Sequence, residues 1–204
     1  MTDPPATPPG HRWFHLVTVD ITPLRRHRDF RLLFVGRLVS FFGSMITVVA
    51  VPYQVYQLSH SVLLVGTLGL VELAALLVFA MLGGALADAA DRRRMVLLSE
   101  AGLMTGSLFL AGNSLLAQPV VWLIFAITAL QASFDALQRP SLDALIPRLV
   151  DRDEIPAAAA LGSVRGTVGM IAGLALAGVL IALIGLPATY LVDVATFVVG
   201  LVCL

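Results

Sequence analysis

The sequence predicts an all-α, polytopic membrane protein with six transmembrane helices. Its 204 residues are 58% hydrophobic and 13% charged, with a formal net charge of zero. A soluble domain is about 45–50% apolar and about 25% charged. The mean hydropathy is +0.93, and six apolar runs approach or exceed the length of about 20 residues that a spanning helix needs. These values argue against a soluble enzyme, a secreted disulfide scaffold and a disordered protein. The neutral total argues against a nucleic-acid partner.

The segment before the first span has a different composition. Residues 1–24 begin with the Pro-rich, polar run MTDPPATPPG, which is typical of a disordered tail. The segment does not fit a signal peptide, because no short apolar core follows a basic start. We therefore expect a tail over residues 1–24 and a helical bundle over residues 25–204.

The first two spans are predicted at Leu32–Leu58 and Ser61–Ala87. The first is interrupted only by Arg37 near its start and by Pro52 near its end. The second contains Glu72 eleven residues from its beginning, close to the membrane midplane. Neither run alternates as a β-barrel strand would, so both are predicted as helices.

The third and fourth spans are predicted at Met95–Leu116 and Val120–Leu137. Glu100 lies early in the third, and we expect it to face the headgroup interface. Asp135 lies late in the fourth, and Pro140 should kink or end that helix shortly afterwards.

The fifth and sixth spans are predicted at Ala157–Ile184 and Pro187–Leu204. Arg165 lies near the start of the fifth, where we expect it, like Arg37, to reach the headgroups by snorkelling. The sixth span ends without a polar flank, so we expect the chain to be part of a longer protein.

All thirteen basic residues are arginines, and every one falls on the same side of the predicted membrane. The turns near residues 59–60, 117–119 and 185–187 contain none. Arginine marks the cytoplasmic side of membrane proteins. The sequence therefore predicts a multi-pass protein of the plasma (inner) membrane, in contact with lipid, with a cytoplasmic N-terminus.

The connection between the second and third spans concentrates small and charged residues. Asp88 and Arg92 are four residues apart, a spacing that suits an ion pair if one helix continues through both. Gly84 lies one turn before Asp88, where a missing side chain permits close helix approach. The alternative is that Arg92 and Arg93 only set topology and that Gly84 only packs.

Residues 84–93 resemble the signature loop of the major facilitator superfamily, G-x3-D-[RK]-x-G-[RK]-[RK]. Ala89 stands where the family has a basic residue, and Asp91 stands where it has glycine. Three other stretches, residues 30–37, 50–61 and 145–160, are similar to the enterobactin-exporter branch. The resemblance covers residues 27–204.

This resemblance implies the first six-helix half of a twelve-helix transporter that works by alternating access. A missing C-terminal half or a second copy would then be the partner. The resemblance further implies that Gly84, Asp88, Arg92 and Arg93 form a gate and do not touch the solute.

Carboxylates inside a membrane are candidates for function by default. Glu72 is the first candidate for proton coupling or solute contact, against a structural hydrogen bond as the alternative. Asp193 is a second candidate for the same roles, with a structural role favoured. Asp135, Arg139 and Asp143 are spaced four apart, which predicts an ion network beside the gate, against a solvated helix end as the alternative.

Four glycines of the fifth span, Gly162, Gly166, Gly169 and Gly173, share one helix face. The stripe resembles a motif of proton-coupled drug exporters, although Met170 stands where that motif has proline. A helix-packing face is the simpler interpretation.

The function expected from these features is secondary active efflux of a small organic solute, siderophore-like or drug-like, with proton coupling as a further expectation. One alternative is a non-transporting six-helix fragment or scaffold. An intramembrane enzyme is disfavoured, because Glu72 and Asp135 lie at different depths. No P-loop and no zinc-ligand spacing occurs in the sequence, so no cofactor and no metal are expected.

Overall fold

The structure is a computed structural model that describes residues 20–89 and 91–204, and for residues 83–89 only the course of the helix. Five helices of the described part are long and apolar enough to cross a membrane. The elements are α1 (Thr22–Arg26), α2 (Arg28–Ser59), α3 (Val62–Ala89), α4 (Arg92–Ser114), α5 (Val121–Leu145), η2 (Ile146–Arg148), η3 (Arg152–Glu154) and α6 (Ile155–Cys203).

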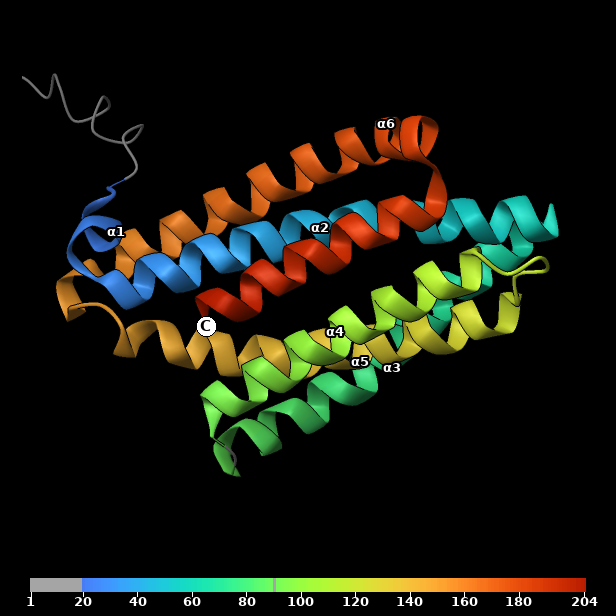
Figure 1. Ribbon diagram of the computed structural model, residues 1–204. Coiled ribbons are helices and arrows are strands. Elements are labelled where there is room, and N and C mark those ends of the chain that lie inside the picture. The colour runs from blue at the N-terminus through green and yellow to red at the C-terminus, as the bar shows by residue number, and fades with distance from the viewer. Residues whose placement is uncertain (1–19, 90) are drawn as a thin grey trace, which may run out of the picture.

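The last helix, α6, consists of two rods that meet at a sharp break. Gly185 has φ 76° and ψ 169°, a conformation that is essentially restricted to glycine. Pro187 follows, where its ring would clash with a continuing helix. The chain therefore reverses at Gly185 (Figure 1), and the six predicted rods are confirmed.

The connections between the helices divide into two groups at opposite ends of the bundle (Figure 1). One end, which we call the arginine end, carries α1, the α3–α4 connection and the η2–η3 segment. The other end carries the α2–α3 turn, the α4–α5 loop and the Gly185 break. The arginine-rich connections of the described chain thus lie together, as the sequence predicted.

Two hairpin ends differ locally from the sequence prediction. No single helix runs through Asp88 and Arg92, because α3 ends at Ala89 and α4 begins at Arg92. Asp91 caps α4 by accepting hydrogen bonds from the backbone N–H groups of Arg93 (2.9 Å) and Arg94 (3.3 Å). Pro140 was predicted to kink or end the fourth helix, and it does not end it, since α5 continues to Leu145.

The helix α2 packs between the two arms of α6, and glycines make the approach possible. A Cβ on Gly173 would lie 2.8 Å from the carbonyl oxygen of Phe42, and one on Gly36 would lie 2.8 Å from Cys203 Cβ. Small residues at such positions allow helices in lipid to come into backbone contact. On the other side of the bundle, α5 packs against both α3 and α4.

The short helix α1 is tied to the start of α6. Arg26 Nη1 lies 3.2 Å from Glu154 Oε1, and His27 Nε2 lies 2.8 Å from Glu154 Oε2. Asp151 lies 3.8 Å from the same His27 nitrogen, so three side chains with metal-ligand atoms meet here. Both carboxylate oxygens of Glu154 already have a partner, so the cluster joins α1 to the start of α6 through ion pairs. The helix begins at Thr22, within the range predicted as tail, and residues 1–19 lie outside the description.

Candidate solute-binding cavity

A cavity of about 410 Å³ opens between the helices, and its wall combines apolar and charged side chains. Drug-sized ligands occupy cavities of about 300–1,000 Å³. The lining comes from α2, α3, α4, α5 and the second arm of α6. Its charged members are Arg37, Glu72, Asp135, Arg139 and Asp193.

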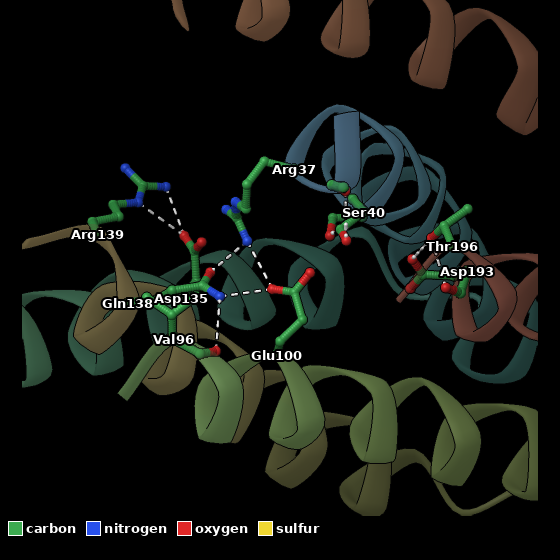
Figure 2. Close-up of polar contacts among 11 residues, drawn as sticks. Arg37, Ser40, Val96, Glu100, Asp135, Gln138, Arg139, Asp193 and Thr196 are labelled. Atoms are coloured by element: carbon green, nitrogen blue, oxygen red, sulfur yellow. Dashed lines mark hydrogen bonds and ion pairs between the residues drawn. The ribbon is translucent and has the colours of Figure 1, made fainter. Parts of the chain in front are cut away.

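A buried ion pair forms the wall of the cavity nearest the arginine end. Arg37 Nη1, on α2, donates to Glu100 Oε2 of α4 at 2.7 Å and to Gln138 Oε1 of α5 at 2.8 Å. Gln138 Nε2 donates back to Glu100 Oε2 at 2.6 Å (Figure 2). These three side chains, which we call the first tier, are between 0% and 8% exposed.

The first tier contradicts two expectations from the sequence. Arg37 does not snorkel and Glu100 does not face the headgroups, because each is buried against the other. Gly200 makes this possible, since a Cβ there would lie 2.7 Å from Glu100 Oε1. Two buried atoms of the tier, Arg37 Nε and Glu100 Oε1, have no hydrogen-bond partner among the described residues.

A second set of polar side chains, the middle tier, crosses the bundle at Asp193. Asp193 Oδ2 accepts hydrogen bonds from Thr47 Oγ1 at 2.6 Å and from Ser107 Oγ at 2.7 Å. Gln131 Nε2 donates to Ser107 Oγ at 3.0 Å. The carboxylate is thereby held by α2 and α4, and Gln131 links it to α5. Asp193 is 1% exposed, so one side chain both fixes the packing and reaches the cavity wall.

A third tier lies toward the opposite end, where Tyr190 donates its hydroxyl hydrogen to Gln54 Oε1 at 2.8 Å. Both residues are almost fully buried. They sit beside the largest apolar cluster, which includes Val51, Val55 and Leu110. The second arm of α6 is thus bonded to α2 at two depths.

Glu72, on α3, is the cavity carboxylate without a partner. It is half-buried and lines the cavity, and no described side chain donates a hydrogen bond to it or pairs with it. Its neighbours on the same wall are Gly69, Leu73 and Leu76. An unpaired carboxylate inside a membrane is a candidate binding group for a proton or a cation.

The predicted network of Asp135, Arg139 and Asp143 is present in part. Arg139 donates to Asp135 Oδ2 through Nε (3.0 Å) and Nη2 (2.7 Å), and the pair lines the cavity (Figure 2). Asp143 is exposed and pairs with none of the described side chains. Arg92 instead donates a hydrogen bond to the carbonyl oxygen of Ala144 at 3.1 Å.

The other predicted gate residues lie around the α3–α4 connection. Gly84 and Asp88 belong to the last turns of α3. For both residues the structure describes only the course of the helix, so their contacts lie outside the description. Arg93 Nη2 donates to the carbonyl oxygen of Leu204 at 2.7 Å. Together with Arg92, it ties the start of α4 to α5 and to the end of the second arm of α6.

The glycine stripe of α6 divides into two halves. Gly169 and Gly173 pack on α2, where a Cβ would lie 2.7 Å from the Phe41 ring and 2.5 Å from Met45 Cβ. Gly162 and Gly166 face no described atom within 4 Å. Close packing within the described chain therefore involves only the second half of the stripe.

The polar residues of the tiers follow a regular spacing along their helices. Most of them were placed wrongly or not singled out by the sequence analysis. Arg37, Ser40, Thr47 and Gln54 recur along α2 at intervals of three and seven, which places them on one helix face. Glu100 and Ser107 are likewise seven apart on α4, and Gln131 and Gln138 on α5. Polar residues repeating at this interval in apolar helices are the signal that could have located the tiers.

Comparisons of this chain with a family model and with curated proteins agree on one family. A family model described as transmembrane secretion effector, of the major facilitator superfamily, matches residues 18–204. The enterobactin exporter EntS of Salmonella choleraesuis (strain SC-B67) is 30% identical over 84% of this chain and 42% of its own length. Its counterpart from Citrobacter koseri is 30% identical over 84% of the chain and 41% of its own. The chain thus spans about two fifths of these relatives, and no solved structure matches it significantly.

Proposed function

Since the chain belongs to the transmembrane secretion effector family of the major facilitator superfamily, we propose that it is one half of a secondary active exporter. The exporter would move a small organic solute, siderophore-like or drug-like, out of the cytoplasm by alternating access. The curated relatives that match include enterobactin exporters, which supports an efflux role. The arginine end would face the cytoplasm in the inner membrane.

The observation that carries this proposal is the cavity. It lies among spanning helices, has room for a small organic molecule and is lined by both apolar and charged side chains. In transporters of this kind the solute site lies near the bilayer midplane, between two halves that move against each other. The missing partner would be a C-terminal half or a second copy.

Within this proposal Glu72 is the coupling group. It lines the cavity and has no partner among the described side chains, so it can hold a proton in one state and release it in another. The tiers of Arg37 and Asp193 would supply the fixed frame. Asp193 therefore takes a mainly structural role, as an acceptor for Thr47 and Ser107.

The gate would lie at the arginine end. The Asp135–Arg139 pair borders the cavity, and Arg92 and Arg93 hold the start of α4 against its neighbours. Gly84 and Asp88 are assigned to the same gate by their resemblance to the family motif. Asp143 would contribute from the exposed end of α5.

A direct test is efflux from energised cells that carry the full transporter, with a panel of catechol-containing siderophores and aromatic drugs. Ala132 lines the cavity, whereas Ala126 lies on the exposed face of the same helix. Ala132→Trp should fill the cavity and reduce efflux at least about tenfold, a loss of about 1.4 kcal/mol or more. Ala126→Trp is the matched control and should export at the parent rate.

Coupling and gating are tested with Glu72→Gln and Asp88→Asn in the same assay. Glu72→Gln should abolish the component of efflux driven by a pH gradient, because the amide cannot carry a proton. Asp88→Asn should slow efflux of every solute. Parental rates in both variants would contradict the assigned roles. Absence of efflux for the whole panel, with the protein present in the membrane, would favour the scaffold alternative.

A further inference from the structure

The charged side chains that this chain contributes to the cavity wall do not cancel, because more of them are negative than positive. Both cations on its wall are already paired, Arg37 with Glu100 and Arg139 with Asp135, at 2.7 Å each. Two carboxylates, Glu72 and Asp193, have no cationic partner among the described side chains. This chain therefore contributes surplus negative charge to the cavity, in a setting of low dielectric where an unpaired charge is costly.

The two surplus carboxylates differ in access. Asp193 is 1% exposed and is satisfied by the hydroxyl groups of Thr47 and Ser107. Glu72 is half-buried and has neither a hydroxyl nor an amide donor among the described residues. A ligand that enters the cavity can neutralise Glu72 directly, whereas it reaches Asp193 only by displacing the middle tier.

The wall around Glu72 suits an amphipathic ligand. Apolar side chains from α2 and α3 (Met45, Val48, Leu73 and Leu76) line the same cavity. Phe41 of α2 adds an aromatic ring, and ring faces attract cations. A carboxylate set among such groups favours a cation on an apolar or aromatic body over a small hydrated ion.

An anionic ligand finds no comparable site among the described residues of the cavity wall. Arg37 Nη1 is already bound by Glu100 and Gln138, and Arg37 is only 8% exposed. An anion would have to separate that buried pair, leaving Glu100 uncompensated, which is strongly unfavourable. Arg139 is mostly exposed, and its guanidinium already donates two hydrogen bonds to the Asp135 carboxylate, which offsets its charge.

From this charge balance we propose that the solute is an amphipathic cation whose positive group binds the Glu72 carboxylate. The inference rests on the proposed exporter function and deepens it by naming the solute's charge. A protonated amine, a quaternary ammonium or a phosphonium group on an aromatic body has this chemistry. Proton and solute then compete for one carboxylate, which is the arrangement that an antiporter needs.

The experiment compares two ions of the same shape and opposite charge, tetraphenylphosphonium and tetraphenylborate. Binding of each radiolabelled ion to the purified full-length transporter in detergent is measured by equilibrium dialysis. The signal from Ala132→Trp is subtracted, so that only binding in the cavity is counted. Tetraphenylphosphonium should bind saturably, and tetraphenylborate should show no binding above the Ala132→Trp level.

The decisive variants are Glu72→Gln, which keeps the shape but removes the charge, and Glu72→Asp, which keeps the charge. Glu72→Gln should weaken phosphonium binding at least about tenfold, and Glu72→Asp should stay within about threefold of the parent. Size-exclusion elution and a thermal melt check that each variant is folded. A folded Glu72→Gln protein that binds phosphonium as the parent does would overturn the proposal, as would preferential binding of the borate.

The outcomes separate this inference from the proposed function. If the solute panel is exported and Ala132→Trp blocks it, while phosphonium does not bind, only the charge assignment fails. If no solute is exported at all, the exporter function fails, whichever ion binds.

Discussion

At the level of single residues, the Arg37–Glu100 pair is the contact most sensitive to substitution. Both side chains are buried, and the pair joins α2 to α4 with Gln138 of α5 as a shared partner. Loss of one partner leaves an uncompensated charge in the bundle, which costs about 3–5 kcal/mol, whereas apolar replacement of both can be neutral.

This asymmetry predicts the outcome of a double-mutant cycle in the full transporter. Arg37→Met and Glu100→Leu should each lower the melting temperature clearly, and the double variant should be more stable than either single variant. The measurement is a thermal melt followed by tryptophan fluorescence in detergent. Arg94→Ala is the control, because the Arg94–Asp91 pair is exposed and 3.8 Å long and should contribute little. A double variant less stable than both single variants would contradict the prediction.

The wrong prediction for these two residues has a physical cause. In a soluble helix the buried face is apolar and the outer face is polar, so the pattern shows which side packs. In a membrane both faces are apolar, because lipid covers the outer one. Hydropathy therefore locates a span along the chain, but it does not show which face of the helix packs inside the bundle. The seven-residue spacing of polar side chains on α2 and α4 marks the inward face, but it does not show that Arg37 and Glu100 are partners.

At the level of elements, the break in α6 depends on one backbone conformation. Gly185 adopts φ 76° and ψ 169°, and the sequence predicted a turn at residues 185–187, between the fifth and sixth apolar runs. The direction of the second arm could not be predicted in the same way. That direction is set by the contacts of Asp193, Tyr190 and Gly200 with α2 and α4, which are distant in the chain.

Gly185→Ala should therefore destabilise the protein by about 1–3 kcal/mol, since non-glycine residues are strained in this region of φ and ψ. Gly178→Ala is the matched control. Gly178 is exposed within the helical part of α6, and a Cβ there would meet no described atom within 4 Å, so alanine should be neutral or slightly stabilising. Thermal melts of the two variants side by side test the difference. Equal melting temperatures would show that the break tolerates alanine.

At the level of the whole molecule, the sequence predicted the number of rods and their up-and-down order correctly. Both follow from local properties, namely the length of the apolar runs and the position of the arginines. The cavity could not be predicted in this way, because its wall draws on five helices. Glu72 was nevertheless identified in advance, since a carboxylate in the middle of an apolar span stands out without knowledge of its neighbours.

The orientation of the bundle can be tested by cysteine labelling in intact cells. In a Cys203→Ser background, Ala117→Cys places a thiol on the α4–α5 loop, and Arg152→Cys places one at the arginine end. Both positions are exposed. A membrane-impermeant maleimide added outside should label Ala117→Cys and leave Arg152→Cys unlabelled until the membrane is opened. The reverse pattern would place the arginine end outside.

The dependence on a second half is tested by expressing residues 1–204 alone and together with the rest of the transporter as a separate chain. Efflux should require both chains, because the enterobactin exporters that match are about twice as long as this chain. The melting temperature of this chain should also rise when its partner is present, as it does whenever a partner binds only the folded state. Efflux by the lone chain would instead point to an assembly of identical copies.

The three polar tiers restrict how this half can move. Arg37, Thr47 and Gln54 bond α2 to its neighbours at three depths. Sliding α2 along its own axis by one turn, about 5.4 Å, would break all of these bonds together. Axial translation of α2 is thereby blocked, whereas a tilt that carries α2, α4, α5 and the second arm of α6 as one unit breaks no tier bond. α3 and the first arm of α6 contain no tier residue, and the first arm is packed on α2 at Gly169 and Gly173. A shift of α3 would therefore break no tier bond, and it would carry Glu72 with it.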